Sequence, residues 1–276
     1  MHLIILGLGY TASRIADAVR SQGGSVRATG SNGDIAFDDR GTVRLAIAQA
    51  THILSSIPPA ADGDPVLATY GDDIAASSAW IGYLSSTGVY GDCGGAWVDE
   101  SAPIKGRRGN RNAADLAWLD LGARVFRLPG IYGPDRSALD RVREGKAHRV
   151  DLPDQIFSRI HVDDIVSAVL AGFEGPPGAY NIADDAPCSQ NDVIDYAAGL
   201  CGRESPPMIG LDDPSLSPMA RAFYGENRRV ANAKAKRLLG WMPHYPTYRE
   251  GLRALSATAM PPSASALPPT ANSDQR

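Results

Sequence analysis

The feature that most constrains this chain is its N-terminal stretch, MHLIILGLGYTASRIADAV over residues 1–19. The apolar run at residues 3–6 has the length and composition of a strand buried on both faces. Apolar Ile15, Ala16 and Val19 then follow at helical spacing, and GLGYTA lies between the two patterns. A strand, a glycine turn and a helix in this order predict the first unit of a parallel α/β sheet.

The turn matches the spacing G-x-G-x-x-G/A. In that pattern Gly7 permits a tight bend, Gly9 lets the backbone approach a pyrophosphate, and small Ala12 lets the helix pack closely on the strand. Tyr10 and Thr11 lie in the first helical turn, where free N–H groups and the positive end of the helix dipole favour phosphate. Because the motif directly follows a strand, it favours dinucleotide binding over a plain turn.

Composition and charge exclude several classes of protein. The chain has 276 residues, 43% hydrophobic and 21% charged, which is enough for one or two domains with a large core. The net charge of −4 and the lack of a basic block argue against nucleic acid and anionic lipid as partners. No apolar run reaches the roughly 18 residues of a membrane span. We therefore expect a cytoplasmic protein that acts on a small molecule and has no membrane partner.

The three cysteines lack C-x-x-C spacing. This number and spacing argue against a disulfide framework and against a zinc site. We expect no metal centre.

Strand and helix patterns alternate beyond the first unit. We expect further strands at residues 25–29, 35–38, 51–57, 80–86, 123–128 and 179–183, and helices within residues 63–78, 112–122, 190–200 and 231–239. This alternation predicts an α/β fold with a Rossmann-like, doubly wound parallel sheet and a small C-terminal substrate-binding lid.

The expected domain limits follow from changes in this pattern. Residues 1–180 form the NAD(P)-binding domain, with a lid insertion near residues 134–158, and residues 181–256 form the lid. Residues 257–276 are dominated by Pro, Ser, Ala and Thr, which predicts a disordered tail.

Ligands of open α/β sheets bind at the carboxyl ends of the strands. Ser31 and Asn32, after the second strand, include neither the acidic residue typical of NAD binding nor the basic residue typical of NADP binding. Both cofactors stay open, with a slight preference for NADP. Asp38 could lie near the adenine or in a solvated turn. The other expected cofactor contacts share positions at or after strand ends: Ser55, Pro58, Ser85, Pro129, Gly130 and Ile131.

Five segments, GLGYTA, LSSTGVYGD, RLPGIYGP, RIHVDDI and YNIADD, occur in one order along the chain. They resemble motifs of the extended short-chain dehydrogenase/reductase superfamily, the NAD-dependent epimerase/dehydratase group, over nearly everything except the tail. With the ending NRRVANAKAKRLLGW, the chain is most similar to the atypical YeeZ-like subgroup. The resemblance implies hydride transfer, with NAD or NADP, on a nucleotide-sugar-like or other hydroxyl- or carbonyl-bearing metabolite.

In the resembled superfamily a tyrosine, acidified by a lysine four residues later and helped by Ser or Thr, moves the proton. Ser86 falls on the Ser/Thr position, and counting back from Asp115 puts Arg111 at the lysine and Arg107 at the tyrosine. Arginine cannot donate a proton near neutral pH, because its pKa exceeds about 12. Arg111 can still hydrogen-bond the nicotinamide ribose. Tyr90, and with less support Tyr132 or Tyr83, could supply a phenol as a substitute acid, although a packed tyrosine is the commoner role.

The same resemblance suggests where substrate binds. Ser86 and Thr87 lie at a strand end, and Tyr224, Asn227, Arg228 and Arg229 form a polar and basic cluster in the expected lid. Two guanidinium groups could hold a diphosphate or a carboxylate by forked hydrogen bonds. A solvated helix start explains the cluster equally well.

Several charged residues are expected to be structural. His161 is conceivable as a general base but is favoured as a packed residue, and Asp163 or Asp164 is expected to cap the helix that follows. We expect Arg127 to be an internal ion-pair partner and Glu100 to be solvated.

The missing tyrosine leaves two functions open. One is an enzyme with an atypical active site; the alternative is a catalytically silent NAD(P)-responsive sensor. Reuse of the fold without a cofactor is a third reading. By analogy with the superfamily, a homodimer could form through helices near residues 72–78 and 112–122.

Overall fold

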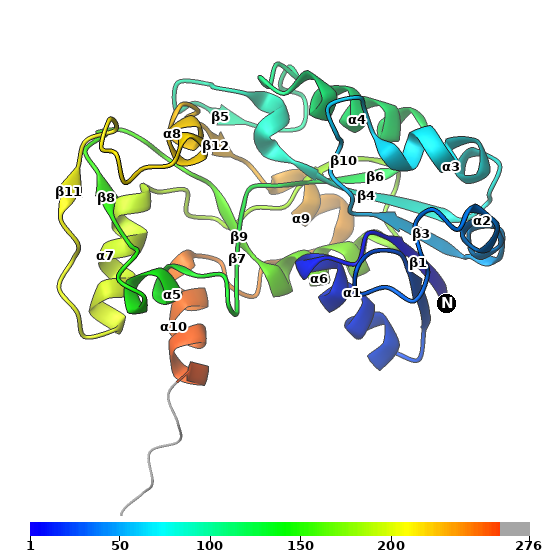
Figure 1. Cartoon of the computed structure of the whole chain (residues 1–276), viewed down its shortest axis with the longest axis horizontal. Coiled ribbons are helices and arrows are strands. Elements are labelled where there is room, and N and C mark those ends of the chain that lie inside the picture. Colours follow the sequence, from blue (N-terminus) through cyan, green and yellow to red (C-terminus); the bar gives the residue numbers. More distant parts are fainter. Residues whose placement is uncertain (260–276) are drawn as a thin grey trace, which may run out of the picture.

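The computed structural model describes residues 1–259, apart from the side chains at positions 219, 220 and 259. Its centre is a six-stranded sheet in the order β10-β6-β4-β3-β1-β2, and every neighbouring pair is parallel (Figure 1). The strands are β1 (His2–Leu6), β2 (Ser25–Ala28), β3 (His52–Ser55), β4 (Trp80–Ser86), β6 (Arg124–Leu128) and β10 (Gly178–Asn181). The order reverses direction at β1, which is the arrangement of a Rossmann-like sheet. The predicted fold class is confirmed.

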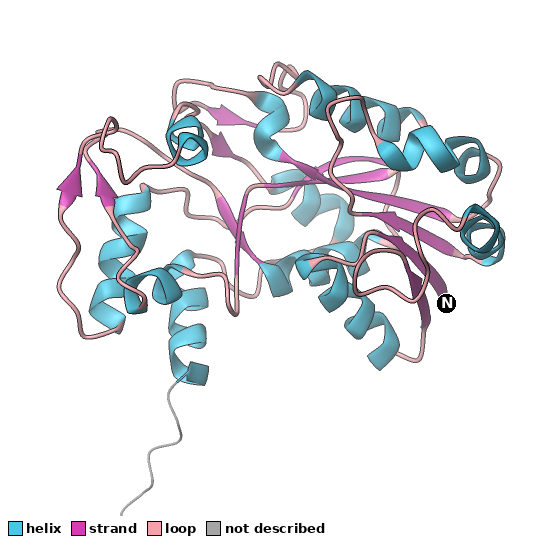
Figure 2. Ribbon diagram, viewed as in Figure 1, coloured by secondary structure: helices cyan, strands magenta, loops and turns pink. Residues whose placement is uncertain are grey.

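Alternation along β1 explains why helices cover both faces of the sheet. Leu3 and Ile5 belong to one apolar core, and Ile4 and Leu6 belong to the other, because successive side chains of a strand point to opposite faces. The first core is closed by α1 (Tyr10–Ser21), α6 (Val162–Gly172) and α9 (Ala233–Leu239). The second is closed by α2 (Arg40–Gln49), α3 (Pro65–Ala75) and α4 (Gly109–Asp120) (Figure 2).

A smaller part lies beside the sheet and is built around a separate apolar core. Helices α5 (Ala138–Arg143), α7 (Gln190–Leu200) and α10 (Tyr248–Ala259) enclose that core, and α8 (Pro218–Tyr224) contributes to a further small apolar cluster; all four lie toward the left of Figure 1. Three parallel two-stranded sheets accompany them: β8 (Arg149–Val150) with β11 (Met208–Ile209), β5 (Trp97–Val98) with β12 (Arg229–Val230), and β7 (Gly130–Tyr132) with β9 (Arg159–His161).

The segment after β2 differs from expectation. Residues 35–38 are not a strand, because only Ile35 makes an isolated bridge, to Thr29. The chain turns here instead: Asp34 accepts the N–H of Ala28, and Asp39 accepts the N–H of Thr42 and caps α2, a helix that sequence reasoning missed. Local hydrogen bonds of short acidic side chains therefore replaced the expected sheet ladder.

The helix boundaries also need two corrections. Helix α4 begins at Gly109, three residues before the predicted start at residue 112. Residues 257–259 belong to α10 and not to the expected disordered tail; residues 260–276 lie outside the described residues.

The start of α6 is not capped by an aspartate. The Nδ1 atom of His161 accepts the N–H of Asp163, so the histidine is the N-cap. Asp164 is fully buried and accepts the N–H groups of His244 and Tyr245, which holds the loop before α10 against α6. Glu100 is not simply solvated, because it accepts the N–H of Asn181.

Candidate active site

The glycine turn after β1 is anchored on one side and open on the other. Gly7 has φ +100°, and a Cβ there would lie 2.5 Å from Ile57 Cγ1, so only glycine fits. The N–H of Gly7 donates to Thr29 Oγ1 at 3.0 Å. A Cβ at Gly9 would meet no atom within 4 Å. The space in front of Gly9 is therefore available to a ligand.

The N-terminus of α1 faces this turn without a cap. Gly9 is the N-cap and supplies no side chain. The N–H groups of Tyr10, Thr11 and Ala12 have no acceptor in the part of the chain that the structure describes. The Tyr10 hydroxyl donates to the Pro134 carbonyl at 2.8 Å, which ties this helix end to the segment that follows β7. Free N–H groups at the positive end of a helix suit a phosphate, so the residues present fit a dinucleotide.

The end of β2 carries the residues expected near the adenosine half of a cofactor. Ser31 and Asn32 are exposed, and Asp38 is exposed in the turn before α2. The next acidic residue in the sequence, Asp34, is paired with Arg27. At the end of β3, Ser55 is buried and its hydroxyl has no partner among the described residues, while Pro58 is exposed.

Adjacent serines at the end of β4 point to opposite faces. Ser86 lines a cavity of about 190 Å³. Its Oγ accepts the N–H of Gly88 at 3.1 Å, which leaves the hydroxyl hydrogen free to donate. The Ser85 hydroxyl donates to Asp115 at 2.6 Å, inside the core. The expectation that Ser85 contacts a cofactor therefore finds no support from its side chain.

Ser85 belongs to a buried network of polar side chains. Asp115 and Arg127 pair at 2.6 Å between Oδ1 and Nη2, with side chains 0% and 2% exposed. Arg127 Nη1 donates to the Tyr90 hydroxyl at 2.9 Å, and that hydroxyl donates to Asn181 Oδ1 at 2.7 Å. The predicted internal role of Arg127 is confirmed. Burial raises the pKa of Tyr90, and its hydroxyl lies in this network rather than in the cavity, so the geometry counts against it as a substitute acid.

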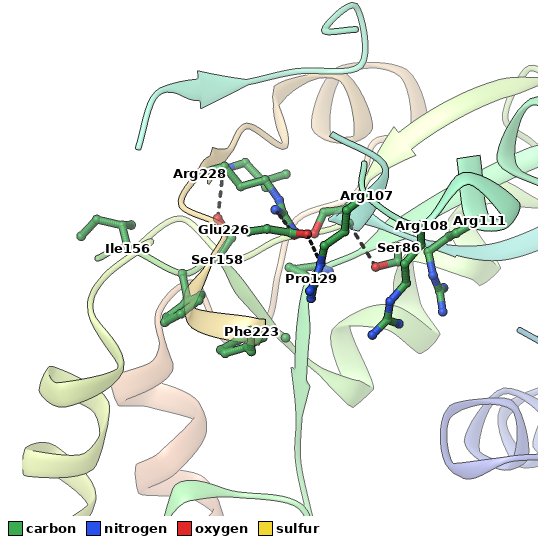
Figure 3. Close-up of a pocket in the computed structure, with 15 residues that line it drawn as sticks. Ser86, Arg107, Arg108, Arg111, Pro129, Ile156, Ser158, Phe223, Glu226 and Arg228 are labelled. Atoms are coloured by element: carbon green, nitrogen blue, oxygen red, sulfur yellow. Dashed lines mark hydrogen bonds and ion pairs between the residues drawn. The ribbon is translucent and has the colours of Figure 1, made fainter. Parts of the chain in front are cut away.

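The cavity beside Ser86 is rich in arginine. Arg107, Arg108 and Arg111 reach it from the loop before α4 and its first turn, and Arg228 reaches it from the segment between α8 and β12. Figure 3 shows Arg108 and Arg111 pointing away from Glu226, the one carboxylate among the described lining residues. Within residues 1–259 neither of these two guanidinium groups has a hydrogen bond or an ion pair.

Glu226 is shared by the other two arginines. Arg107 Nε lies 2.8 Å from Oε1, and Arg228 Nη1 lies 2.7 Å from Oε2. Arg228 Nη1 also donates to the Gly91 carbonyl at 2.8 Å. These contacts join the smaller part of the molecule to the sheet side of the cavity.

The predicted site residues divide between two cavities. Thr87, Pro129 and Gly130 line the smaller one with Ser86, Arg111 and Arg228. Ile131 and Tyr224 line a neighbouring cavity of about 730 Å³. The two share Gly130, Phe157, Ser158 and Phe223 as lining residues. The structure thus brings most of the expected substrate residues together in the smaller cavity and places Tyr224 in the neighbouring, larger one.

Sequence reasoning missed several lining residues. Arg108 stands in the doublet Arg107-Arg108, a signal that could have been used. Phe157 and Phe223 stack with their ring centroids 4.2 Å apart, a long-range contact for which the sequence holds no local signal. The same holds for Glu226.

Two members of the expected lid cluster have structural contacts instead. The carbonyl of Asn227 accepts the N–H groups of Cys93 and Gly95, and its side chain donates to the Asp154 carbonyl. Arg229 donates to the Gly95 carbonyl. Both residues hold the loop before β5 and are not among the lining residues of either cavity.

Other titratable groups are buried with incomplete hydrogen bonding. The hydroxyls of Tyr83 and Tyr132 have no partner among the described residues, and burial raises the pKa of both. Asp184, at the exit of β10, is 2% exposed, and one of its carboxylate oxygens has no partner within residues 1–259; burial raises its pKa to about 7. Among the described lining residues of the smaller cavity there is no tyrosine.

The described residues hold neither a metal-binding cluster nor a membrane-spanning helix. No group of three or more His, Cys, Asp or Glu residues within residues 1–259 could hold a metal ion. In the same residues, no helix combines the length and hydropathy needed to cross a membrane.

The fold defines a class. The chain has the fold of NAD-dependent epimerases and dehydratases. No family model matches the chain. It belongs to the same family as a functionally unknown conserved protein from Silicibacter pomeroyi, which is 42% identical over 93% of this chain and 98% of that one, with a TM-score of 0.83.

More distant structures share the fold. A human epimerase family protein with NADPH is 13% identical, covers 92% of this chain and 99% of its own, and has a TM-score of 0.74. The UDP-glucose 4-epimerase of Thermotoga maritima, with UDP-glucose, is 16% identical over 92% of this chain and 97% of its own, with a TM-score of 0.72.

One curated protein is similar in sequence. The 3-diazoavenalumate denitrifying reductase of a Streptomyces species is 29% identical over 149 residues, which make up 50% of this chain and 48% of the reductase. The chain thus matches about half the length of this relative.

Proposed function

We propose that the protein binds NADP, in preference to NAD, and transfers a hydride between the cofactor and a nucleotide-sugar-like or other hydroxyl- or carbonyl-bearing metabolite. The observation that carries this proposal is the uncapped N-terminus of α1, which opens onto free space at Gly9. Ser86 ends β4 in the same parallel sheet, so both features lie at its carboxyl edge. Relatives of this fold carry NAD or NADPH and nucleotide sugars, which supports the choice of ligands.

Each part of the cofactor has residues that would hold it. The N–H groups of Tyr10, Thr11 and Ala12 would bind the pyrophosphate. Ser31 and Asn32 would face the adenosine end, where Asp34 is already paired with Arg27; this favours the 2′-phosphate of NADP over a free ribose. Ser31 and Asn32 would donate hydrogen bonds to that phosphate.

The nicotinamide end would lie beside the smaller cavity. Arg111 would hydrogen-bond the ribose, and the turn of Pro129, Gly130 and Ile131 would contact the amide. When bound, the nicotinamide supplies or accepts the hydride. Ser86 would donate its free hydroxyl hydrogen to the substrate oxygen and so orient the reacting carbon.

The arginines of the smaller cavity bear on how the substrate could be protonated. Among the described residues no phenol lines the cavity, and a guanidinium group does not release a proton near neutral pH. Arg108 and Arg111 can instead stabilise negative charge that develops on the substrate oxygen, as preorganised donors do elsewhere. A reaction whose product takes its proton from water, or needs none, fits this cavity. That the curated relative is named a reductase supports a reductive direction.

A sensor without catalysis is the second candidate. The absence of tyrosine from the described lining of the smaller cavity favours it. Such a protein would bind dinucleotide and show no turnover, whereas the enzyme would oxidise NADPH when its substrate is supplied.

Titration of NADPH and NADH, followed by nicotinamide fluorescence, tests the shared premise. We expect NADPH to bind more tightly, and Gly9→Ala to weaken it by at least about 10-fold without loss of stability, because the added methyl fills the phosphate space and touches no protein atom. Gly199→Ala, also in open space but in α7, is the matched control and should leave affinity unchanged. If neither dinucleotide binds, both candidates fail and only reuse of the fold remains.

A further inference from the structure

The smaller cavity concentrates positive charge in an otherwise acidic chain. The chain carries a net charge of −4, yet the described lining of this cavity holds four arginines and one glutamate. Clefts lined by one sign of charge raise the local concentration of the opposite ion. The cavity therefore selects an anionic ligand or an anionic group of a larger one.

The contacts of Glu226 show what shape of anion fits. Arg107 binds one carboxylate oxygen at 2.8 Å, and Arg228 binds the other at 2.7 Å. The two guanidinium groups are thus spaced to take one oxygen each of a single carboxylate by charge-assisted contacts.

The bond to Arg107 is also easy to exchange. The Arg107 side chain is 48% exposed, and ion pairs of exposed groups are weak because water competes for both partners. Arg108, next to it, has no ion pair within the described residues and adds attraction for an entering anion. A carboxylate brought by a ligand could therefore take the place of Glu226.

We propose that the substrate bears a carboxylate that binds between Arg107 and Arg228, and that Glu226 holds this position until the substrate displaces it. The proposal rests on the proposed function in one respect, that this cavity receives the substrate. The remainder of the substrate extends past the stacked rings of Phe157 and Phe223, which border both cavities, into the larger one. A flat, apolar body next to the carboxylate suits those rings.

Ligand-detected NMR with benzoate as the probe tests this, with benzamide as its uncharged counterpart and phenyl phosphate as a tetrahedral anion. We expect benzoate to bind more tightly than either. Glu226→Gln should bind benzoate several-fold more tightly, because a competitor that holds the site most of the time is removed. Glu174→Gln, an exposed glutamate elsewhere, removes the same charge and should change nothing. Arg107→Gln should lose at least about 10-fold.

The outcomes separate the two proposals. Equal benzoate binding by the wild type and Arg107→Gln, or an unchanged affinity in Glu226→Gln, would overturn the carboxylate site. Tighter binding of phenyl phosphate would overturn the choice of carboxylate. Titration of NADPH into the same variants is independent of these results: binding of NADPH without selective benzoate binding leaves the proposed function standing, and the reverse leaves the carboxylate site standing.

Discussion

Ser85 and Ser86 are neighbours in β4, yet their hydroxyl groups lie in opposite kinds of environment. Ser85 belongs to a buried network in which Asp115, Arg127, Tyr90 and Asn181 each bond to another member. Ser86 faces a cavity where its hydroxyl hydrogen is free and two guanidinium groups have no ion pair among the described residues. In the interior, complete hydrogen bonding fixes one structure; in the cavity, incomplete bonding leaves places for a ligand.

The comparison shows that residue type alone does not separate the two roles. Both regions contain serine and arginine. Arg127 is 2% exposed and paired with a carboxylate, and it stabilises the fold. Arg111 has the same chemistry and lines the cavity, where no carboxylate of the described residues pairs with it. The site is distinguished by polar groups whose hydrogen-bonding capacity is not filled by the described residues, and not by the type of side chain.

We expect the largest effect on stability from a substitution in the buried network. Asp115→Ala would leave the Arg127 charge buried without its partner, which costs about 3–5 kcal/mol of unfolding free energy. Urea denaturation measures it. Asp120→Ala, an exposed position on the same helix, is the control and should stay within about 0.5 kcal/mol. A loss below about 1 kcal/mol for Asp115→Ala would show that the network is not structural.

Asp184 is an intermediate case: a buried carboxylate with one oxygen that has no partner in the described part of the chain. Its pKa is raised to about 7 in the folded state, so between about pH 4 and 7 the unfolded chain releases a proton that the folded chain keeps. Stability from this group is therefore complete below about pH 4 and falls as pH rises to 7.

Asp184→Asn removes that dependence. The unfolding free energy of the variant minus that of the wild type should rise between pH 4 and 7, by up to about 4 kcal/mol for a shift of roughly 3 units, and then stay level. Urea denaturation across this pH range measures the difference. Parallel stability profiles for the two proteins would contradict the assignment.

The smallest expected effect compares the unfolding free energies of two Tyr→Phe variants. Tyr90→Phe removes a hydroxyl that bonds Arg127 and Asn181, and should cost about 1–3 kcal/mol. Tyr83→Phe removes a buried hydroxyl without a partner among the described residues, and should be neutral or slightly stabilising. Denaturation of the two single variants measures the contrast, which fails if both lose the same stability.

Much of the sheet could be predicted from the sequence, because strands such as β1 and β3 contain apolar runs and are followed by a glycine or proline turn. The glycine turn and the strand end at Ser86 were also readable, since both carry local motifs. Residues 35–38 were misread because Asp34 and Asp39 bond locally and turn the chain there.

Contacts between residues far apart in the sequence could not be predicted from it. Arg107 and Glu226 are 119 positions apart, and no local pattern announces their pairing. Nor does alternation along β4 reveal which of two adjacent serines faces the cavity, because the residues on both sides of this strand are buried. The assignment of Asp163 or Asp164 as a cap failed because His161, one position before the helix, takes that role.

The pairing of β5 with β12 has a practical consequence for spectroscopy. Trp97 in β5 is 60% exposed, whereas Trp80, Trp118 and Trp241 are 8%, 0% and 3% exposed. Its partner strand starts at Arg229, directly after the arginine that holds Glu226. Trp97 is thus a built-in fluorophore at the junction of the two parts of the molecule: a shift in the red edge of the indole emission would report movement there, against a constant background from the three buried indoles.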